Sequence, residues 1–178
     1  MTTDPSGRHL VRAEGDAVAF TRTFRAGIDD VWAAVTESDR LARWIGFYSG
    51  DPLSGHVDFT MNAEGEENMS PTRYDIRRCE PPRVLRVHTA DDFGTWDLII
   101  ELSEADGVTT LVLSQIIDDP STIENTGPGW EYYLDRLSAA IGGSDPDVID
   151  FDDYYPSQRD YYLAVGQSVT GDAGSPQP

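Results

Sequence analysis

The chain has 178 residues, a length typical of one domain, and 39% of them are hydrophobic, which is enough to form a packed core. Its 32 acidic and 13 basic residues give a formal net charge of −19, which repels phosphate backbones and anionic lipids, so we expect no nucleic-acid or membrane partner. Every basic residue is an arginine, which excludes a lysine Schiff base or nucleophile.

The expected cellular location and the role of the cysteine follow from features that the sequence lacks. No stretch approaches 18 consecutive apolar residues, and the first residues show no basic-then-apolar signal pattern, so we expect a cytoplasmic protein. The single cysteine, Cys79, excludes an internal disulfide. Its place beside a proline pair, at the end of a predicted strand, favours an inert thiol.

The first half of the chain alternates between short helical and extended patterns. Residues 1–15 are polar, and we expect them to form a flexible N-terminal arm. Apolar residues alternate over 17–25, which predicts a strand, and 28–46 predicts two short helices separated by a polar break. Several strands separated by turns follow between 57 and 117, and residues 96–102 alternate most regularly.

The last third contains a long helix and an unusual tail. Residues 120–129 are expected to form a loop. A helix is predicted from Trp130 to Ile141, with a single apolar face, and two glycines end it. Residues 144–165 are acidic and aromatic, and we interpret them as an appendage that packs back on the body, while 166–178 are expected to be disordered.

This order of elements indicates the fold class. One strand, two short helices, about five antiparallel strands and a long helix form an α+β domain over residues 16–143. A curved sheet in such a domain can wrap around the last helix and leave space between them.

Four stretches at characteristic spacings indicate a family. They are Phe20-x-Arg22-x-Phe24 before Val31-Trp32-x-Ala34-x-Thr36, then Arg40-Leu41-Ala42-Arg43-Trp44, Glu80-Pro81-Pro82-Arg83-Val84-Leu85 and Thr110-Leu111-Val112-Leu113. Together they resemble the START-like helix-grip proteins of the SRPBCC superfamily. Within it they resemble the branch of homologues of the activator of a heat-shock-protein ATPase, which has many bacterial members.

The resemblance covers about residues 16–143 and carries structural expectations. It implies a seven-stranded antiparallel sheet that grips a long C-terminal helix, with an apolar cavity between them. Many members of the superfamily bind lipids, sterols, hormones or polyketides there. Two departures stand out: the strand after Thr110 ends in Ser114-Gln115-Ile116-Ile117-Asp118-Asp119, and the tail beyond Gly143 lies outside the common domain.

The expected cavity defines a set of candidate ligand-binding residues on the inward strand rows, the mouth and the long helix. The set is Trp44, Phe47, Tyr48, Phe59, Met61, Tyr74, Trp96, Leu98, Leu113, Gln115, Trp130, Tyr133, Leu134 and Leu137. The alternative is that these side chains simply fill a solid core. Tyr74 and Gln115 are the polar members, and each could orient a ligand or make a structural hydrogen bond.

Three functions are therefore open. The first is binding of a small hydrophobic molecule, and the second is an interaction module, with a chaperone or a second copy of the chain as partner and a role in the stress response. The third is an enzyme of the cyclase or dehydratase type, for which the sequence predicts no catalytic residue, metal or cofactor. His9, His56 and His88 lack metal-ligand spacing, and the latter two lie on rows that we expect to face away from the cavity.

Overall fold

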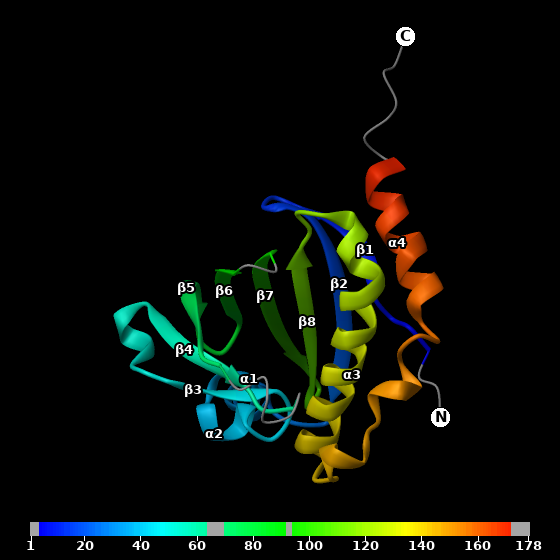
Figure 1. Cartoon of the computed structure of the whole chain (residues 1–178). Helices are drawn as coiled ribbons and strands as arrows, with labels where there is room; N and C mark the ends of the chain where they lie inside the picture. Colours follow the sequence, from blue (N-terminus) through cyan, green and yellow to red (C-terminus); the bar gives the residue numbers. More distant parts are fainter. Residues whose placement is uncertain (1–3, 64–69, 92–93, 172–178) are drawn as a thin grey trace.

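The computed structural model describes residues 4–63, 70–91 and 94–171, and within them eight strands form one antiparallel sheet (Figure 1). The strands are β1 (Arg8–Arg12), β2 (Gly15–Phe24), β3 (Gly46–Ser49), β4 (His56–Met61), β5 (Thr72–Glu80), β6 (Val84–Asp91), β7 (Gly94–Ala105) and β8 (Val108–Ile116). Their order across the sheet is β1-β2-β8-β7-β6-β5-β4-β3. The chain therefore crosses once, from β2, next to the β1 edge, to β3 at the opposite edge, and then returns strand by strand.

The helices lie on one side of this curved sheet. The α-helices are α1 (Ile28–Thr36), α2 (Ser38–Leu41), α3 (Ile123–Gly142) and α4 (Arg159–Gly171), with short 3₁₀ turns η1 (Pro52–Ser54), η3 (Pro120–Thr122), η4 (Pro146–Val148) and η5 (Phe151–Asp153). Figure 1 shows α3 running along the β8–β2 end of the sheet, α4 beside α3, and α1 and α2 near the foot of the sheet. None of the described helices has the length and apolar character needed to cross a membrane.

This arrangement confirms the predicted α+β helix-grip class. The strands β2–β8 are the seven that the resemblance implies, and β1 adds an eighth at the edge beside β2. The prediction of a flexible arm over residues 1–15 is wrong for residues 8–12, which form β1 and pair in register with β2, as in Leu10 opposite Ala17. An edge strand that is exposed to solvent can lack a regular apolar alternation, so residues 8–12 carry no clear strand pattern. Residues 1–3 of the expected arm lie outside the described residues.

Helix α3 begins earlier than the sequence indicates. The expected loop at 120–129 is instead the turn η3 and the first seven residues of α3, which includes Pro128. Tertiary packing explains the difference: Ile123, Gly127 and Pro128 are buried. A Cβ atom added at Gly127 would lie 2.2 Å from the ring of Tyr162, so only glycine lets α4 approach this closely.

The C-terminal segment is also more ordered than predicted. Residues 166–171 continue α4, where we expected disorder, and 172–178 lie outside the described residues. Gly166 is the reason that α4 can continue here, because a Cβ atom at this position would lie 2.5 Å from the carbonyl oxygen of Pro120. Of the aromatic side chains in the acidic segment, Tyr154 and Tyr162 are buried, and Tyr162 is fully so.

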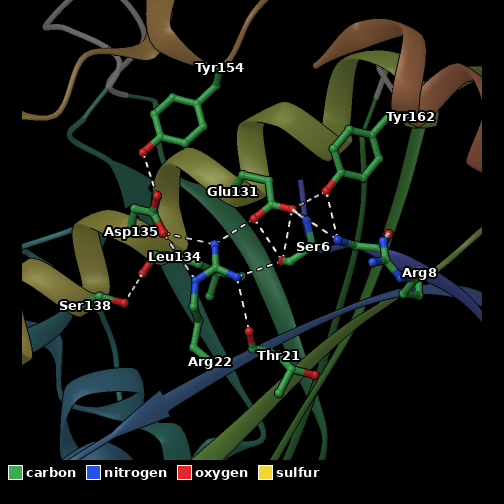
Figure 2. A network of polar contacts seen from close by, with 11 residues as sticks. Ser6, Arg8, Thr21, Arg22, Glu131, Leu134, Asp135, Ser138, Tyr154 and Tyr162 are labelled. Atoms are coloured by element: carbon green, nitrogen blue, oxygen red, sulfur yellow. Dashed lines mark hydrogen bonds and ion pairs between the residues drawn. The ribbon is translucent and has the colours of Figure 1, made fainter. Parts of the chain in front are cut away.

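A buried carboxylate ties the two ends of the chain to α3 (Figure 2). Glu131 is fully buried and forms an ion pair with Arg22 of β2, with 2.6 Å between Oε2 and Nη2. It also accepts hydrogen bonds from the Ser6 hydroxyl at 3.0 Å, the backbone N–H of Gly7 at 3.1 Å and the hydroxyl of Tyr162. One side chain of α3 therefore holds β2, the N-terminal segment and α4.

A second acid one helical turn later extends this network. Asp135 lies 3.0 Å from the same Nη2 atom of Arg22, and it accepts a hydrogen bond of 2.7 Å from the hydroxyl of Tyr154. Figure 2 shows both acids on one face of α3, with Arg22 approaching from β2. This face of the helix is fully used for packing, so the interior cavity must lie on another face.

Candidate functional site

A cavity of about 1360 Å³ lies between the inner face of the sheet and α3, with α1 and α2 at one end. Its wall is mostly aliphatic and aromatic, and every strand from β3 to β8 contributes to it. The lining residues are Trp32, Val35, Thr36, Glu37, Leu41, Trp44, Ile45, Tyr48, Pro52, Val57, Phe59, Met61, Ala63, Ser70, Thr72, Tyr74, Ile76, Cys79, Leu85, Val87, Trp96, Leu98, Ile100, Leu111, Leu113, Asn125, Thr126, Gly129, Trp130, Tyr132, Tyr133, Leu134, Leu137 and Phe151.

The burial of the inward strand rows shows that this space is hollow. Trp96, Leu98 and Ile100 face the interior on β7 but are only half-buried. On the neighbouring strand β8, Leu111 is 1% exposed, and on α3 Leu137 is 0% exposed. The core is thus solid where α3 contacts β2 and β8, and it opens toward β4–β7, whose inward side chains are mostly half-buried among the described residues.

Most of the predicted ligand-binding residues lie on this wall. The structure brings together Trp44, Tyr48, Phe59, Met61, Tyr74, Trp96, Leu98, Leu113, Trp130, Tyr133, Leu134 and Leu137. The ring of Tyr74 packs edge-on against that of Phe59, with 5.6 Å between the ring centroids. Whether these side chains touch a ligand stays a prediction.

Phe47 is outside the cavity wall, contrary to its place in the predicted set. It is 37% exposed, and it neighbours Tyr48 on β3, which does line the cavity. Successive side chains of a strand point to opposite faces, so the two residues cannot both face inward.

Gln115 is also absent from the wall, because its amide is engaged in the core. Its Oε1 atom accepts a hydrogen bond of 2.7 Å from the indole Nε1 of Trp130, and Gln115 is 6% exposed. Of the two roles that the sequence left open for Gln115, the structure shows the structural hydrogen bond. Its effect on the cavity is indirect, since it fixes the orientation of the Trp130 ring.

All four tryptophans of the chain lie on the wall. Two of their indole N–H groups are fixed by the protein: Trp44 donates to the carbonyl oxygen of Ala34 at 3.0 Å, and Trp130 donates to Gln115. Trp32, on α1, is half-buried. The two tryptophans of the α1–α2 region thus lie between the packed core and the cavity, with Trp44 buried in the core.

The polar groups of the wall are few and lie toward its rim. The hydroxyl of Tyr48 donates to the carbonyl oxygen of Thr36 at 3.1 Å, and Ser38 bonds both backbone groups of Tyr48, which holds β3 to α2. Burial raises the pKa of the Tyr48 hydroxyl, and the nearby charge of Glu37 raises it further. The hydroxyl oxygen of Thr126 is buried, and the described residues offer it no hydrogen-bond partner.

The wall offers little for metal binding or acid–base chemistry. His56 and His88 do not line it. Within the described ranges, no three His, Cys, Asp or Glu side chains are arranged to hold a metal ion. The arrangement suits binding by apolar contact, with hydroxyl and amide groups to orient a ligand.

Comparison with known proteins decides the family. Residues 25–142 match the family described as "Activator of Hsp90 ATPase homolog 1-like protein", which is more than half of the chain. The chain belongs to this family. The matched segment runs from the end of β2 to the end of α3 and contains every lining residue of the cavity except Phe151. Strands β1 and β2 and helix α4 lie outside the matched segment.

Solved structures share the fold over nearly the whole chain. The crystal structure of CalU16 from Micromonospora echinospora is 25% identical, covers 98% of this chain and 100% of its own, and gives a TM-score of 0.65. A conserved protein of unknown function from Enterococcus faecalis is 19% identical, with coverage of 92% and 91% and a TM-score of 0.68. DynU16, a protein of the dynemicin biosynthetic locus, is 19% identical, covers 73% of this chain and 49% of its own, and gives a TM-score of 0.56. No curated protein matches the chain.

Sequence reasoning missed several lining residues of this family member for identifiable reasons. Thr126 and Gly129 fell in the stretch expected to be a loop, and Phe151 fell in the appendage. Glu37 lies in the polar break between α1 and α2, where a charged side chain normally indicates a solvated turn. A helical reading of residues 123–129 would have placed Thr126 and Gly129 on the same face as Trp130 and Tyr133.

Proposed function

We propose that this protein binds a large, mainly apolar small molecule in the cavity between the sheet and α3. The observation that supports this most is the cavity of about 1360 Å³, with all four tryptophans on its wall. Pockets for drug-sized ligands are commonly about 300–1,000 Å³, so the space suits a larger molecule. Exposed residues such as Glu37, Asn125 and Phe151 are part of the wall, which gives a ligand access from solvent.

The energetic drive is burial of the half-exposed inner face of the sheet. A ligand that covers Trp96, Leu98 and Ile100 removes apolar surface from water on both sides of the contact. Such burial contributes roughly 25 cal/mol per Å² before the cost of ordering the ligand.

The relatives favour a small molecule over a protein partner. DynU16 comes from a biosynthetic locus, where small molecules are made, and it shares the fold. The acidic aromatic segment that suited a protein interface is largely used within the chain: Tyr154 and Tyr162 are buried, and Phe151 lines the cavity. The family description also suggests a role with a chaperone, but the acidic segment leaves less exposed aromatic surface for such an interface.

Native mass spectrometry of the purified chain tests this proposal. We expect a stoichiometric compound to be retained or, after incubation with the neutral probe 1-pyrenemethanol, a complex with one probe per chain. Denaturation should release the bound compound for identification. A chain that carries no compound and forms no complex with the probe would contradict the proposed function.

A further inference from the structure

The charge of the cavity wall restricts the kind of ligand. Among the described lining residues, Glu37 is the only charged one, and it is exposed at the rim. The deeper wall offers no arginine to neutralise an acidic group. Burial of a carboxylate or phosphate there would cost several kcal/mol without a compensating partner. An acidic ligand is therefore disfavoured both by the wall and by the net charge of −19.

The end of helix α1 adds negative potential beside Glu37. Helix α1 ends at Thr36, with Glu37 as its C-cap, and its last turn contains no basic residue. The C-terminus of a helix carries the negative end of its dipole, which stabilises a nearby cation. Two of the last carbonyl groups accept hydrogen bonds from neutral donors, the Trp44 indole and the Tyr48 hydroxyl. These donors leave the dipole without a compensating charge.

An aromatic ring, that of Tyr48, lies close to Glu37. Trp32 and Tyr48 both line the cavity, and Glu37 lies close enough to Tyr48 for its charge to act on the phenol. Aromatic faces attract ammonium groups, so a carboxylate next to an aromatic ring favours a cation in two ways. The nearby Arg40 is paired with Asp30 at 2.9 Å, and no ion pair within the described residues involves Glu37.

The geometry points to a ligand with a protonated amine, held at the rim by Glu37, the C-terminus of α1 and the ring of Tyr48, with its apolar body in the cavity. This inference rests on the proposed function and adds selectivity for charge. Neutral apolar molecules bind through the same wall but lack the contact with Glu37. Fatty acids and other apolar acids are rejected.

Three probes with one aromatic body test this selectivity. We would titrate the full chain with 1-pyrenemethylamine, 1-pyrenemethanol and 1-pyrenecarboxylic acid and follow fluorescence at roughly 0.15 M salt, where long-range attraction is screened. The amine should bind about fivefold more tightly than the alcohol, and the acid most weakly. Glu37→Gln should remove the advantage of the amine and leave the affinity for the alcohol unchanged.

The matched control is Asp39→Asn. Asp39 is exposed on α2, is not part of the wall, and its substitution changes the net charge by the same amount as Glu37→Gln. It should leave the affinity for all three probes unchanged. Equal affinities for amine and alcohol, or an equal loss of amine binding in Asp39→Asn, would overturn the charge selectivity while the proposed function stands. Failure of the alcohol to bind would overturn the proposed function itself.

Discussion

Replacement of Arg22 with leucine should lower the free energy of unfolding by about 3–5 kcal/mol, the range expected when one partner of a buried ion pair is removed. Glu131 is fully buried, and Arg22 lies within hydrogen-bonding distance of both Glu131 and Asp135. Without the guanidinium, two carboxylates one helical turn apart face each other with no cation between them. Chemical denaturation followed by circular dichroism measures the loss.

Two further variants test whether the loss of stability comes from the buried ion pair rather than from the removal of an arginine in general. Arg73, whose side chain is 62% exposed, pairs with Asp75 on the outer surface, so Arg73→Leu should leave the midpoint of unfolding nearly unchanged. The double variant Arg22→Leu with Glu131→Leu removes both charges and should be less unstable than Arg22→Leu alone. If Arg22→Leu is as stable as Arg73→Leu, the network in Figure 2 does not hold the chain ends to α3.

The same network gives stability a definite pH dependence. Burial alone would raise the pKa of Glu131, but hydrogen bonds from Arg22 and Tyr162 and the charge of Arg22 outweigh it and hold the pKa below its ordinary value of 4.5. A depressed folded-state pKa stabilises the protein above the unfolded pKa, and this contribution is lost as the pH falls through the folded pKa. In Arg22→Leu the pKa of Glu131 should rise toward or above its ordinary value, so acidification should destabilise this variant less than it destabilises the wild type.

Replacement of Gly129 with phenylalanine should weaken binding of 1-pyrenemethanol by tenfold or more without lowering stability. Gly129 lies on the cavity face of α3, and a Cβ atom there would meet nothing within 4 Å. A phenylalanine ring at this position occupies the space that we assign to the ligand. Glycine is also roughly 1 kcal/mol worse than alanine inside a helix, so the substitution adds helix propensity and buried apolar surface. Titration and thermal unfolding measure the two effects.

Two alanine substitutions, at Gly129 itself and at the nearby Gly127, provide the controls for Gly129→Phe. Gly129→Ala adds only a methyl group and should bind the probe as the wild type does. Gly127→Ala places its Cβ against the buried ring of Tyr162, 2.2 Å away, and should lower the unfolding midpoint through overpacking. Unchanged probe affinity in Gly129→Phe would show that the probe binds elsewhere, and a lowered midpoint in that variant would show that the space beside Gly129 is filled.

The sequence predicted which side chains face the cavity where a strand has a regular row of apolar residues. Alternation over residues 96–102 put Trp96, Leu98 and Ile100 on one face, and the structure has all three on the cavity wall. This works because the side-chain period of a strand is two, so a clear apolar row fixes which face is buried. Phe47 and Tyr48 show the limit: adjacent aromatics carry no alternation, and only the paired register of β3 and β4 decides which one points inward.

The parts that the sequence missed depend on contacts between distant segments. Pro128 and its flanking glycines read locally as a loop, and they are helical because this turn is buried, with Gly127 against Tyr162 of α4. Glu131 reads as a solvated position on an amphipathic helix, and it is buried because the N-terminal segment and α4 cover it. Helix propensity and polarity describe the local chain alone, so they cannot report what a segment 30 residues later will cover.

The most direct test of the cavity as a ligand site is a titration of the isotope-labelled chain with 1-pyrenemethanol, followed through the indole N–H signals of its tryptophans in ¹H–¹⁵N spectra. Trp32, Trp44, Trp96 and Trp130 all line the cavity, so their four signals report on it from different sides. We predict that these signals shift together and saturate at one probe per chain, while the amide signals of β1, at the edge of the sheet, stay in place. Indole signals that remain fixed while the probe saturates a site elsewhere would contradict the account.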